Sequence, residues 1–197
     1  MAGYAYAVRN DEVYVNLFMN GKAELRTEKG VLELVQCSDY PWEGTIEMEI
    51  AGEKPLEAKI HIRIPGRALD RPVPSDLFAF TGTAEEEFSL QVNGETAEME
   101  VQDGYVTVER EWNKGDRILL ELPMQSRAII AHDSVAEKKG LVAIQYGPLV
   151  YCAEQTDNPV DVLEATNGRH PVFGASYEPG LLGGVHVLEG EGLVLVP

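Results

Sequence analysis

Apolar and polar residues alternate with a period of two along much of the chain. In the stretch TIEMEI (45–50) the apolar residues share one face of an extended chain, and the polar residues share the other. The stretches EAKIHIRI (57–64), FSLQV (88–92) and ILLEL (118–122) follow the same pattern. Successive side chains of a strand point to opposite faces of a sheet. The alternation therefore predicts strands with one buried and one solvated face, which is typical of antiparallel sheets.

Short turn signals separate these predicted strands, and no stretch keeps a helical period over several turns. Asn-Gly and Asp-Gly pairs tolerate the positive φ angles that tight hairpins require. About a dozen short strands at such spacing indicate an all-β chain. We predict an antiparallel, jelly-roll-like β-sandwich followed by a second, truncated one. The turn signals are Asn20-Gly21, Lys29-Gly30, Asn93-Gly94, Asp103-Gly104 and Lys114-Gly115-Asp116.

Two segments interrupt this rhythm. The segment 66–85 contains Pro72 and Pro74 and then the apolar run LFAF, so it predicts a long loop that tucks Phe78 or Phe80 against a surface. A charged connector at 131–140 predicts a domain boundary. We therefore expect one complete sandwich at residues 3–130 and a partial second sandwich at residues 131–197. The apolar run LVLV near the end predicts that the chain is a piece of a longer protein, because an edge strand this apolar needs a neighbour.

The acidic composition excludes several classes of partner. The formal net charge is −17, from 33 acidic and 16 basic residues. No basic cluster interrupts this charge, so we expect neither nucleic-acid nor anionic-membrane binding. A run of about 18 apolar residues, the length of a membrane span, is absent. The start MAGYAYAVRN lacks the basic and apolar regions of a signal peptide. The compartment, bacterial cytoplasm or periplasm, stays open.

Residue types that carry catalysis or bind metals are scattered. The two cysteines, Cys37 and Cys152, lack the spacing of a metal or redox motif, and the four histidines form no close pair. Acidic residues are so numerous that no carboxylate pair stands out as a glycosidase pair. Nucleophile-elbow and phosphate-loop motifs are absent. From the residues alone, we expect no catalytic residue and no metal site in this chain.

The stretch QYGPLVYCAE (145–154) contains a cysteine, two tyrosines and a carboxylate. Its continuous apolar run, bounded by Gly147 and Pro148, predicts a strand buried on both faces. We interpret Gly147, Pro148, Tyr151 and Cys152 as structural residues. A catalytic thiol is the alternative, but no basic residue lies near Cys152 in the sequence to lower the pKa of its thiol.

Aromatic residues near turns are the candidate ligand-binding groups. Trp42 lies in the stretch DYPWEG together with Tyr40, and Trp112 lies in EREWNKGD. A tryptophan on the rim of a sandwich can stack on a sugar ring while nearby carboxylates accept hydroxyl hydrogen bonds. The alternative is that these rings fill the end of the core or a domain interface.

Several segments, taken together and in order, resemble the C-terminal half of glycoside hydrolase family 127, the β-L-arabinofuranosidase family. No segment is specific by itself, but the order runs from Gly3 to Gly184. One departure is Arg67, which stands where many relatives have a tryptophan after Ile-Pro-Gly. The matching segments are GYAYAV (3–8), VYVNLF (13–18), YPWEG (40–44), IRIPG (62–66), VNG (92–94), GYV (104–106), WNKGD (112–116), LPM (122–124), QYGPLVYCAE (145–154) and LGG (182–184).

The resemblance implies a division of labour. In that family an N-terminal (α/α)6 barrel carries catalysis with a zinc-bound cysteine nucleophile and acidic partners, and β-sandwich domains follow it. No position of this chain matches the zinc or nucleophile motif, so no catalytic residue is carried over. Cys152 matches the structural GPLVYC strand. The resemblance thus implies that zinc belongs to the barrel and that the partner of this chain is the barrel domain, with arabinose-containing glycans as the substrate class.

Three functions remain open at this point. The first is a non-catalytic structural module that packs on and stabilises the barrel, and that is inactive by itself. The second is a carbohydrate-binding module that uses the rim aromatics Tyr40, Trp42 and Trp112. The third is a pure interaction domain, which predicts an exposed apolar patch.

Overall fold

The computed structural model describes residues 2–98, 100–158, 161–162, 165–166, 173–190 and 193–194. The chain divides into two compact units. Unit 1 comprises Met1–Leu69 and Glu87–Pro123, and unit 2 comprises Asp70–Glu86 and Met124–Pro197. Strands dominate both, which confirms the all-β prediction. Within the described residues the helical pieces are α1 (Ala2–Ala5), η1 (Gly66–Leu69), η2 (Ala136–Lys138) and η3 (Gln155–Asp157), and no helix there is long and apolar enough to cross a membrane.

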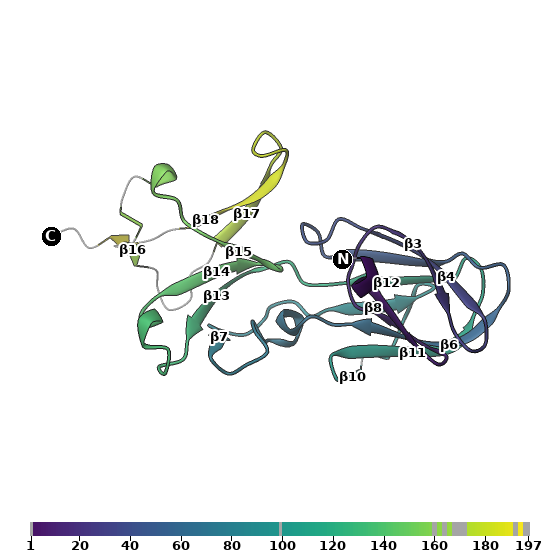
Figure 1. The fold of residues 1–197 in the computed structure, drawn as a ribbon. Helices are drawn as coiled ribbons and strands as arrows, with labels where there is room; N and C mark the ends of the chain where they lie inside the picture. The colour runs from purple at the N-terminus through teal and green to yellow at the C-terminus, as the bar shows by residue number, and fades with distance from the viewer. Residues whose placement is uncertain are drawn as a thin grey trace. The chain divides into compact units, whose positions relative to one another are not determined.

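Unit 1 consists of two sheets (Figure 1). Neighbouring strands are antiparallel except β2 and β6, which are parallel. The five-stranded sheet has the order β1 (Tyr6–Arg9), β2 (Glu12–Val15), β6 (Leu56–Arg63), β11 (Tyr105–Trp112) and β10 (Val101–Gln102). The six-stranded sheet has the order β3 (Gly21–Arg26), β4 (Val31–Ser38), β5 (Thr45–Ile50), β12 (Arg117–Glu121), β8 (Ser89–Val92) and β9 (Glu95–Thr96).

One hydrophobic core joins the two sheets of unit 1. Val13 and Ile60 of the first sheet and Leu34, Ile46 and Leu120 of the second belong to the same cluster and are fully buried. In β5 and β6 the apolar residues that the alternation assigns to one face are the buried ones. The period-two prediction is therefore confirmed residue by residue in these two strands.

Two of the predicted turn signals close tight hairpins. Asn93 and Gly94 have φ angles of 54° and 82° between β8 and β9, and Asp103 and Gly104 have 52° and 83° between β10 and β11. Positive φ at both central residues is the geometry that Asn-Gly and Asp-Gly favour. The signal at Gly115 has a different role, because it connects β11 of one sheet to β12 of the other.

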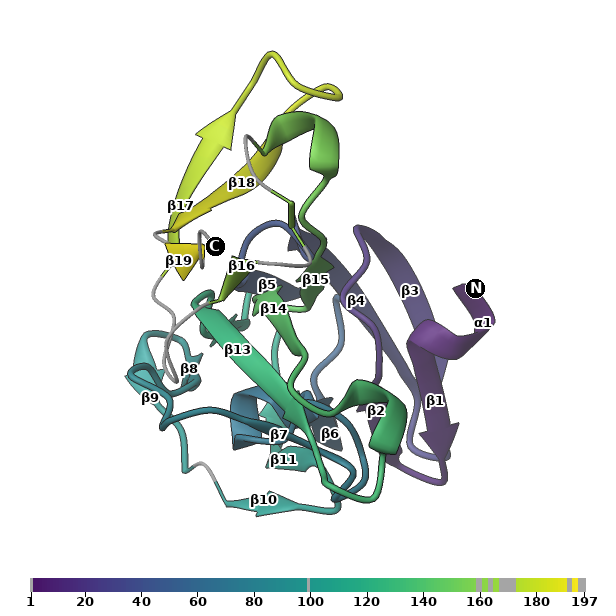
Figure 2. The same cartoon turned by 90° about the vertical axis from the view of Figure 1, so that its left-hand side faces the viewer.

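Unit 2 contains a four-stranded sheet with the order β15 (Leu149–Tyr151), β14 (Val142–Tyr146), β13 (Ser126–Ala131) and β7 (Phe78–Phe80). Figure 2 shows β13 beside β14. The unit also contains the hairpin of β17 (Phe173–Glu178) and β18 (Val185–Gly190), and the pair β16 (Ala165–Thr166) and β19 (Leu193–Val194). The hairpin contacts the sheet, because the Tyr151 hydroxyl donates a hydrogen bond of 3.0 Å to the carbonyl of His186.

The segment predicted as a long loop leaves unit 1 and returns to it after adding a strand to unit 2. It contains β7, which pairs with β13, so the loop prediction was incomplete. Arg127 holds the segment in place: its guanidinium lies 3.7 Å from the Phe80 ring centroid, pairs with Asp70 at 2.6 Å and donates to the carbonyl of Gly82 at 3.0 Å. The prediction that Phe78 or Phe80 packs against a surface holds for Phe80.

The stretch 145–154 differs from its prediction in burial. Gln145 and Gly147 are buried, but Val150 is 68% exposed and Cys152 is exposed. The prediction of burial on both faces was therefore wrong, and Cys152 does not fill a core. The reason is that β15 is the edge strand of its sheet and has a neighbouring strand on one side only, and Val150 points to the opposite face from the half-buried Leu149 and Tyr151. Tyr151 keeps a structural role through its hydrogen bond to β18.

The expected domain limits, 3–130 and 131–197, remain a prediction. In the structure, unit 1 ends at Pro123 and the chain continues in unit 2 from Met124, so β13 lies wholly in unit 2.

Two substitutions in this stretch should behave differently. Gly147 has φ +53° and lies against the Met124 side chain. Gly147→Ala should lower the free energy of unfolding by about 1–2 kcal/mol, because the added Cβ is strained in this conformation and overlaps Met124. Cys152→Ala should change it by less than about 0.5 kcal/mol, because its side chain is exposed. Urea unfolding followed by circular dichroism measures both. Equal effects would contradict the assignment of β15 as a half-solvated edge strand.

Candidate functional site

The rim of unit 1 presents Trp42 on an exposed turn. The Trp42 backbone N–H donates to the carbonyl of Asp39 at 2.8 Å, which closes the turn, and 43% of the tryptophan remains exposed. Tyr40 is half-buried, with its ring edge-on to Phe18 at 5.5 Å. Of these two predicted rim aromatics, Trp42 is the more exposed, and Tyr40 packs against the buried Phe18.

Trp112 is fully buried in the core of unit 1, so its prediction as a ligand-binding residue was wrong. Its indole Nε1–H donates a hydrogen bond of 3.1 Å to the carbonyl of Ala58 on the neighbouring strand β6. Trp112 lies on the same face of β11 as the buried Val106, and this face packs against the opposite sheet. The alternative weighed for it, packing in the core, is the one that the structure supports, and Trp42 and Trp112 do not form a joint site.

Arg67 lies against the rim. Its guanidinium carbon is 5.8 Å from the Tyr40 ring centroid, and Nη1 donates to the carbonyl of Pro123 at 2.5 Å. Arg67 Nε and Nη2 are buried and have no hydrogen-bond partner among the residues that the structure describes. The residue that departs from the family pattern thus takes a packing position beside an aromatic ring, as a large planar side chain does.

The outer face of the five-stranded sheet carries a polar cluster that the sequence analysis missed. Tyr14 stacks on His61 with ring centroids 4.3 Å apart and planes inclined by 11°. The Tyr14 hydroxyl donates to Glu12 Oε2 at 2.9 Å, and His61 Nδ1 is 2.8 Å from the Thr107 hydroxyl. Tyr105 packs edge-on against Tyr14 at 5.5 Å. The parallel pairing of β2 with β6 aligns Tyr14 with His61, and no local signal predicts this pairing.

The environment of His61 favours its neutral form. Burial lowers the pKa of His61, and the Glu12 carboxylate opposes this effect only in part. His61 Nε2 is buried 4.0 Å from Glu12 Oε2 and has no hydrogen-bond partner in the described part of the chain. The hydrogen bond to Glu12 raises the pKa of the Tyr14 hydroxyl. The cluster therefore contains an imidazole whose neutral form is favoured by burial.

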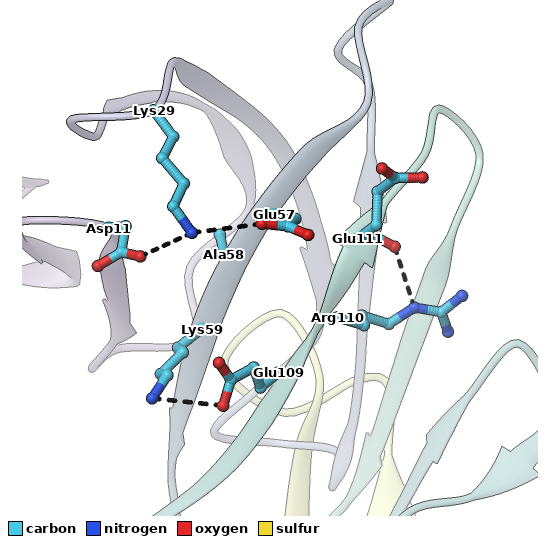
Figure 3. A pocket seen from close by; sticks show the side chains of 8 residues that line it. All are labelled: Asp11, Lys29, Glu57, Ala58, Lys59, Glu109, Arg110 and Glu111. Atoms are coloured by element: carbon cyan, nitrogen blue, oxygen red, sulfur yellow. Dashed lines mark hydrogen bonds and ion pairs between the residues drawn. The ribbon is translucent and has the colours of Figure 1, made fainter.

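A shallow depression lies at one end of the same sheet (Figure 3). Its volume is about 160 Å³, which is below the roughly 300–1,000 Å³ of a small-molecule pocket. Its charges pair with one another: Lys29 contacts Asp11 at 3.0 Å and Glu57 at 3.5 Å, and Lys59 contacts Glu109 at 3.3 Å (Figure 3). The Lys29 hydrogen bond lowers the pKa of Asp11. Such solvent-exposed pairs contribute little stability, and they engage both lysines that line the depression.

The zinc that the family resemblance implies has no donor set in the described residues. No three His, Cys, Asp or Glu side chains of that part of the chain lie close enough to hold a metal ion. Cys37 and Cys152 are both exposed and unpaired as a disulfide. Zinc requires three or four convergent N, S or O ligands. The residues described therefore do not fit the metal, and no chemical step is assigned to it in this chain.

Comparisons with known proteins match two family models in sequence. Residues 12–124 match the β-L-arabinofuranosidase GH127 middle domain, and residues 126–184 match the glycoside hydrolase family 127 C-terminal domain. A non-reducing end β-L-arabinofuranosidase of Bifidobacterium longum subsp. longum is 34% identical over 165 residues, which cover 80% of this chain and 22% of that enzyme.

Solved structures agree with this match. The structure of a GH127 β-arabinofuranosidase superposes with a TM-score of 0.91 at 36% identity, covering 98% of this chain and 30% of that one. A GH127 β-L-arabinofuranosidase from Geobacillus stearothermophilus T6 has a TM-score of 0.81 at 29% identity, with coverages of 95% and 27%. The chain thus spans between a fifth and a third of the length of these relatives.

The half-buried His61 predicts a pH dependence of stability. The pKa of His61 is lower in the folded chain than in the unfolded one, so its contribution to stability is complete above the unfolded value of about 6.5 and is lost as the pH falls below it. Between about pH 7.5 and 5.5 the Tm of the native chain should fall more steeply than that of His61→Gln. Parallel slopes for the two proteins in thermal melts would contradict the assignment.

Proposed function

The chain belongs to glycoside hydrolase family 127, and we propose that it is the non-catalytic β-sandwich portion of a β-L-arabinofuranosidase-like enzyme. In this proposal it packs on and stabilises an N-terminal catalytic barrel. The observation that carries the proposal is coverage: the chain runs through a middle-domain and a C-terminal-domain model in order, yet spans 22% of the curated relative. The larger part of such an enzyme lies outside the matched region.

The structure of unit 1 supports a scaffolding role. Its two sheets share one core of fully buried apolar residues, which gives a rigid body that does not depend on a ligand. The polar cluster on its outer face is held by internal hydrogen bonds, and the depression beside it is lined by ion pairs. A rigid body of this kind stabilises a neighbouring domain by presenting a fixed surface to it.

Under this proposal the chemistry belongs to the barrel. Hydrolysis of a β-L-arabinofuranosidic bond and the recognition of arabinose-containing glycans take place there, and this chain by itself is inactive. Its contribution to activity is indirect, because a barrel that loses its supporting surface unfolds at lower temperature and positions its catalytic groups less accurately.

A deletion and a replacement in the Bifidobacterium longum enzyme test this role. Removal of the segment that matches this chain should lower the Tm of the enzyme by at least about 5 °C and reduce arabinose release from a β-L-arabinofuranoside. A chimera that carries this chain in place of the segment should recover most of both losses. An unchanged Tm and activity after the deletion, or turnover by this chain alone, would overturn the proposal.

Carbohydrate binding is the second candidate function, and the exposed face of Trp42 favours it. A tryptophan of this kind contributes to sugar binding by stacking on the apolar face of a ring. Asp39 and Glu43 are exposed on the same turn and could accept hydroxyl hydrogen bonds. Trp112 takes no part, because it is buried.

Titration with arabinose-containing oligosaccharides tests this second function. Binding should change the fluorescence of this chain, and Trp42→Phe should abolish the change, whereas buried Trp112 gives a constant signal. No response up to millimolar sugar would remove carbohydrate binding at Trp42 as a function of the isolated chain.

A further inference from the structure

Four exposed apolar side chains lie on neighbouring segments at one end of unit 1. Tyr4 is 79% exposed, Leu17 39%, Met19 41% and Trp42 43%. We call these four residues the end patch. They come from α1, from the segment 16–20 between β2 and β3, and from the turn after β4.

Hydrogen bonds and one ring contact bring these segments together. The backbone N–H groups of Asn16 and Leu17 donate to the carbonyl of Ala5, next to Tyr4, at 2.8 and 3.3 Å. The Gln36 side chain donates to the carbonyls of Leu17 and Met19 at 3.2 and 2.8 Å. The segment 16–20 is therefore fixed between α1 and the end of β4.

The orientation of the patch follows from alternation within that segment. Phe18 is buried and packs against the ring of Tyr40, two residues before Trp42. Leu17 and Met19 flank Phe18 in the sequence and are exposed. One inward aromatic ring thus anchors the segment and leaves its two apolar neighbours on the solvent side.

The residue types of the patch distinguish it from the rest of the unit 1 surface. The other large apolar residues exposed in the described part of this unit are Val8, Val31 and Val35, which are β-branched residues of strands. Tyrosine, tryptophan and methionine, by contrast, are enriched at protein interfaces. Polar residues border the patch at Asn20, Asp39 and Glu43, which resembles the polar rim around an interface core.

We propose that the end patch is the surface of the middle domain on which the preceding N-terminal domain of the enzyme packs. This inference rests on the proposed function and names its contact surface. The family match describes a middle domain that begins at residue 12, so the family's enzymes have a further domain before it. The chain enters unit 1 through Tyr4, inside the patch, so a preceding domain is tethered within a few residues of it. Tethering at this distance gives a high effective concentration for docking.

The proposal gives Trp42 a specific role. Trp42 is 43% exposed and lies two residues after Tyr40, which packs on Phe18 between Leu17 and Met19. It is a candidate anchor residue, because tryptophans buried on binding carry a large share of binding energy at interfaces. Docking would cover the ring face that is otherwise available for a sugar. Interface anchor and sugar platform are therefore competing roles for the same side chain.

Surface substitutions in the Bifidobacterium chimera test the patch. Trp42→Ser and Leu17→Ser should each lower the Tm of the chimera by at least about 4 °C more than Val31→Ser does. Val31 is a matched control, because it is 44% exposed and lies at the opposite end of β4. In the isolated chain the three substitutions should have similar, small effects, because all three side chains are exposed there.

Fluorine NMR gives a readout that is independent of stability. With 5-fluorotryptophan incorporated, the Trp42 signal is identified by its loss in Trp42→Phe. A soluble paramagnetic agent should broaden this signal in the isolated chain and leave it sharp in the chimera, because docking covers the ring.

The outcomes separate the two proposals. If the chimera is more stable than the truncated enzyme but Trp42 stays accessible and Trp42→Ser acts like Val31→Ser, the end patch is not the contact surface, and the scaffolding role stands. If the chimera is no more stable than the truncated enzyme, both proposals fail. Protection of Trp42 together with the larger Tm losses supports the end patch.

Discussion

Burial of one face of each strand is the constraint on which the structure of unit 1 depends. Two sheets meet through their apolar faces, and every second residue of β5, β6 and β12 lies in the shared core. The face on which a residue lies determines whether its side chain is buried. Trp112 lies on the inner face and is fully buried, whereas His61 lies on the outer face beside Tyr14. A shift of one residue in the register of a strand would move each of its side chains to the opposite face of the sheet.

Unit 2 satisfies the same constraint less completely. Its sheet has buried residues in the middle, at Arg127, Ala128 and Ile129, but its edge strand β15 exposes Val150 and its neighbour Cys152. Part of the interior of this unit is polar, since Arg127 packs on an aromatic ring and pairs with a carboxylate. A buried guanidinium needs such partners because desolvation of an unpaired charge is costly. The segment 70–86 supplies them, which explains why it leaves unit 1.

The surface of unit 1 matches a supporting role better than a catalytic one in the residues described. Its outer polar cluster is held by two side-chain hydrogen bonds, whereas its exposed tyrosine, leucine, methionine and tryptophan lie on adjoining segments at one end. Internally satisfied polar groups have little to gain from a ligand, but exposed apolar groups gain free energy when a partner removes them from water. The scaffolding and sugar-binding hypotheses differ at Trp42. The first places this side chain in a contact with another domain, and the second leaves it exposed to bind a sugar.

Much of the fold could be predicted from the sequence by local rules. Alternation identified the strands and their inner faces, and Asn93-Gly94 and Asp103-Gly104 identified hairpins, because side-chain parity and positive φ are properties of neighbouring residues. Tertiary structure alone decided three other features: the burial of Trp112, the exposure of Cys152 and the meeting of Tyr14 with His61. Each depends on which strands become neighbours and which sheet face is covered. These are long-range outcomes, and side-chain alternation within one strand does not determine them.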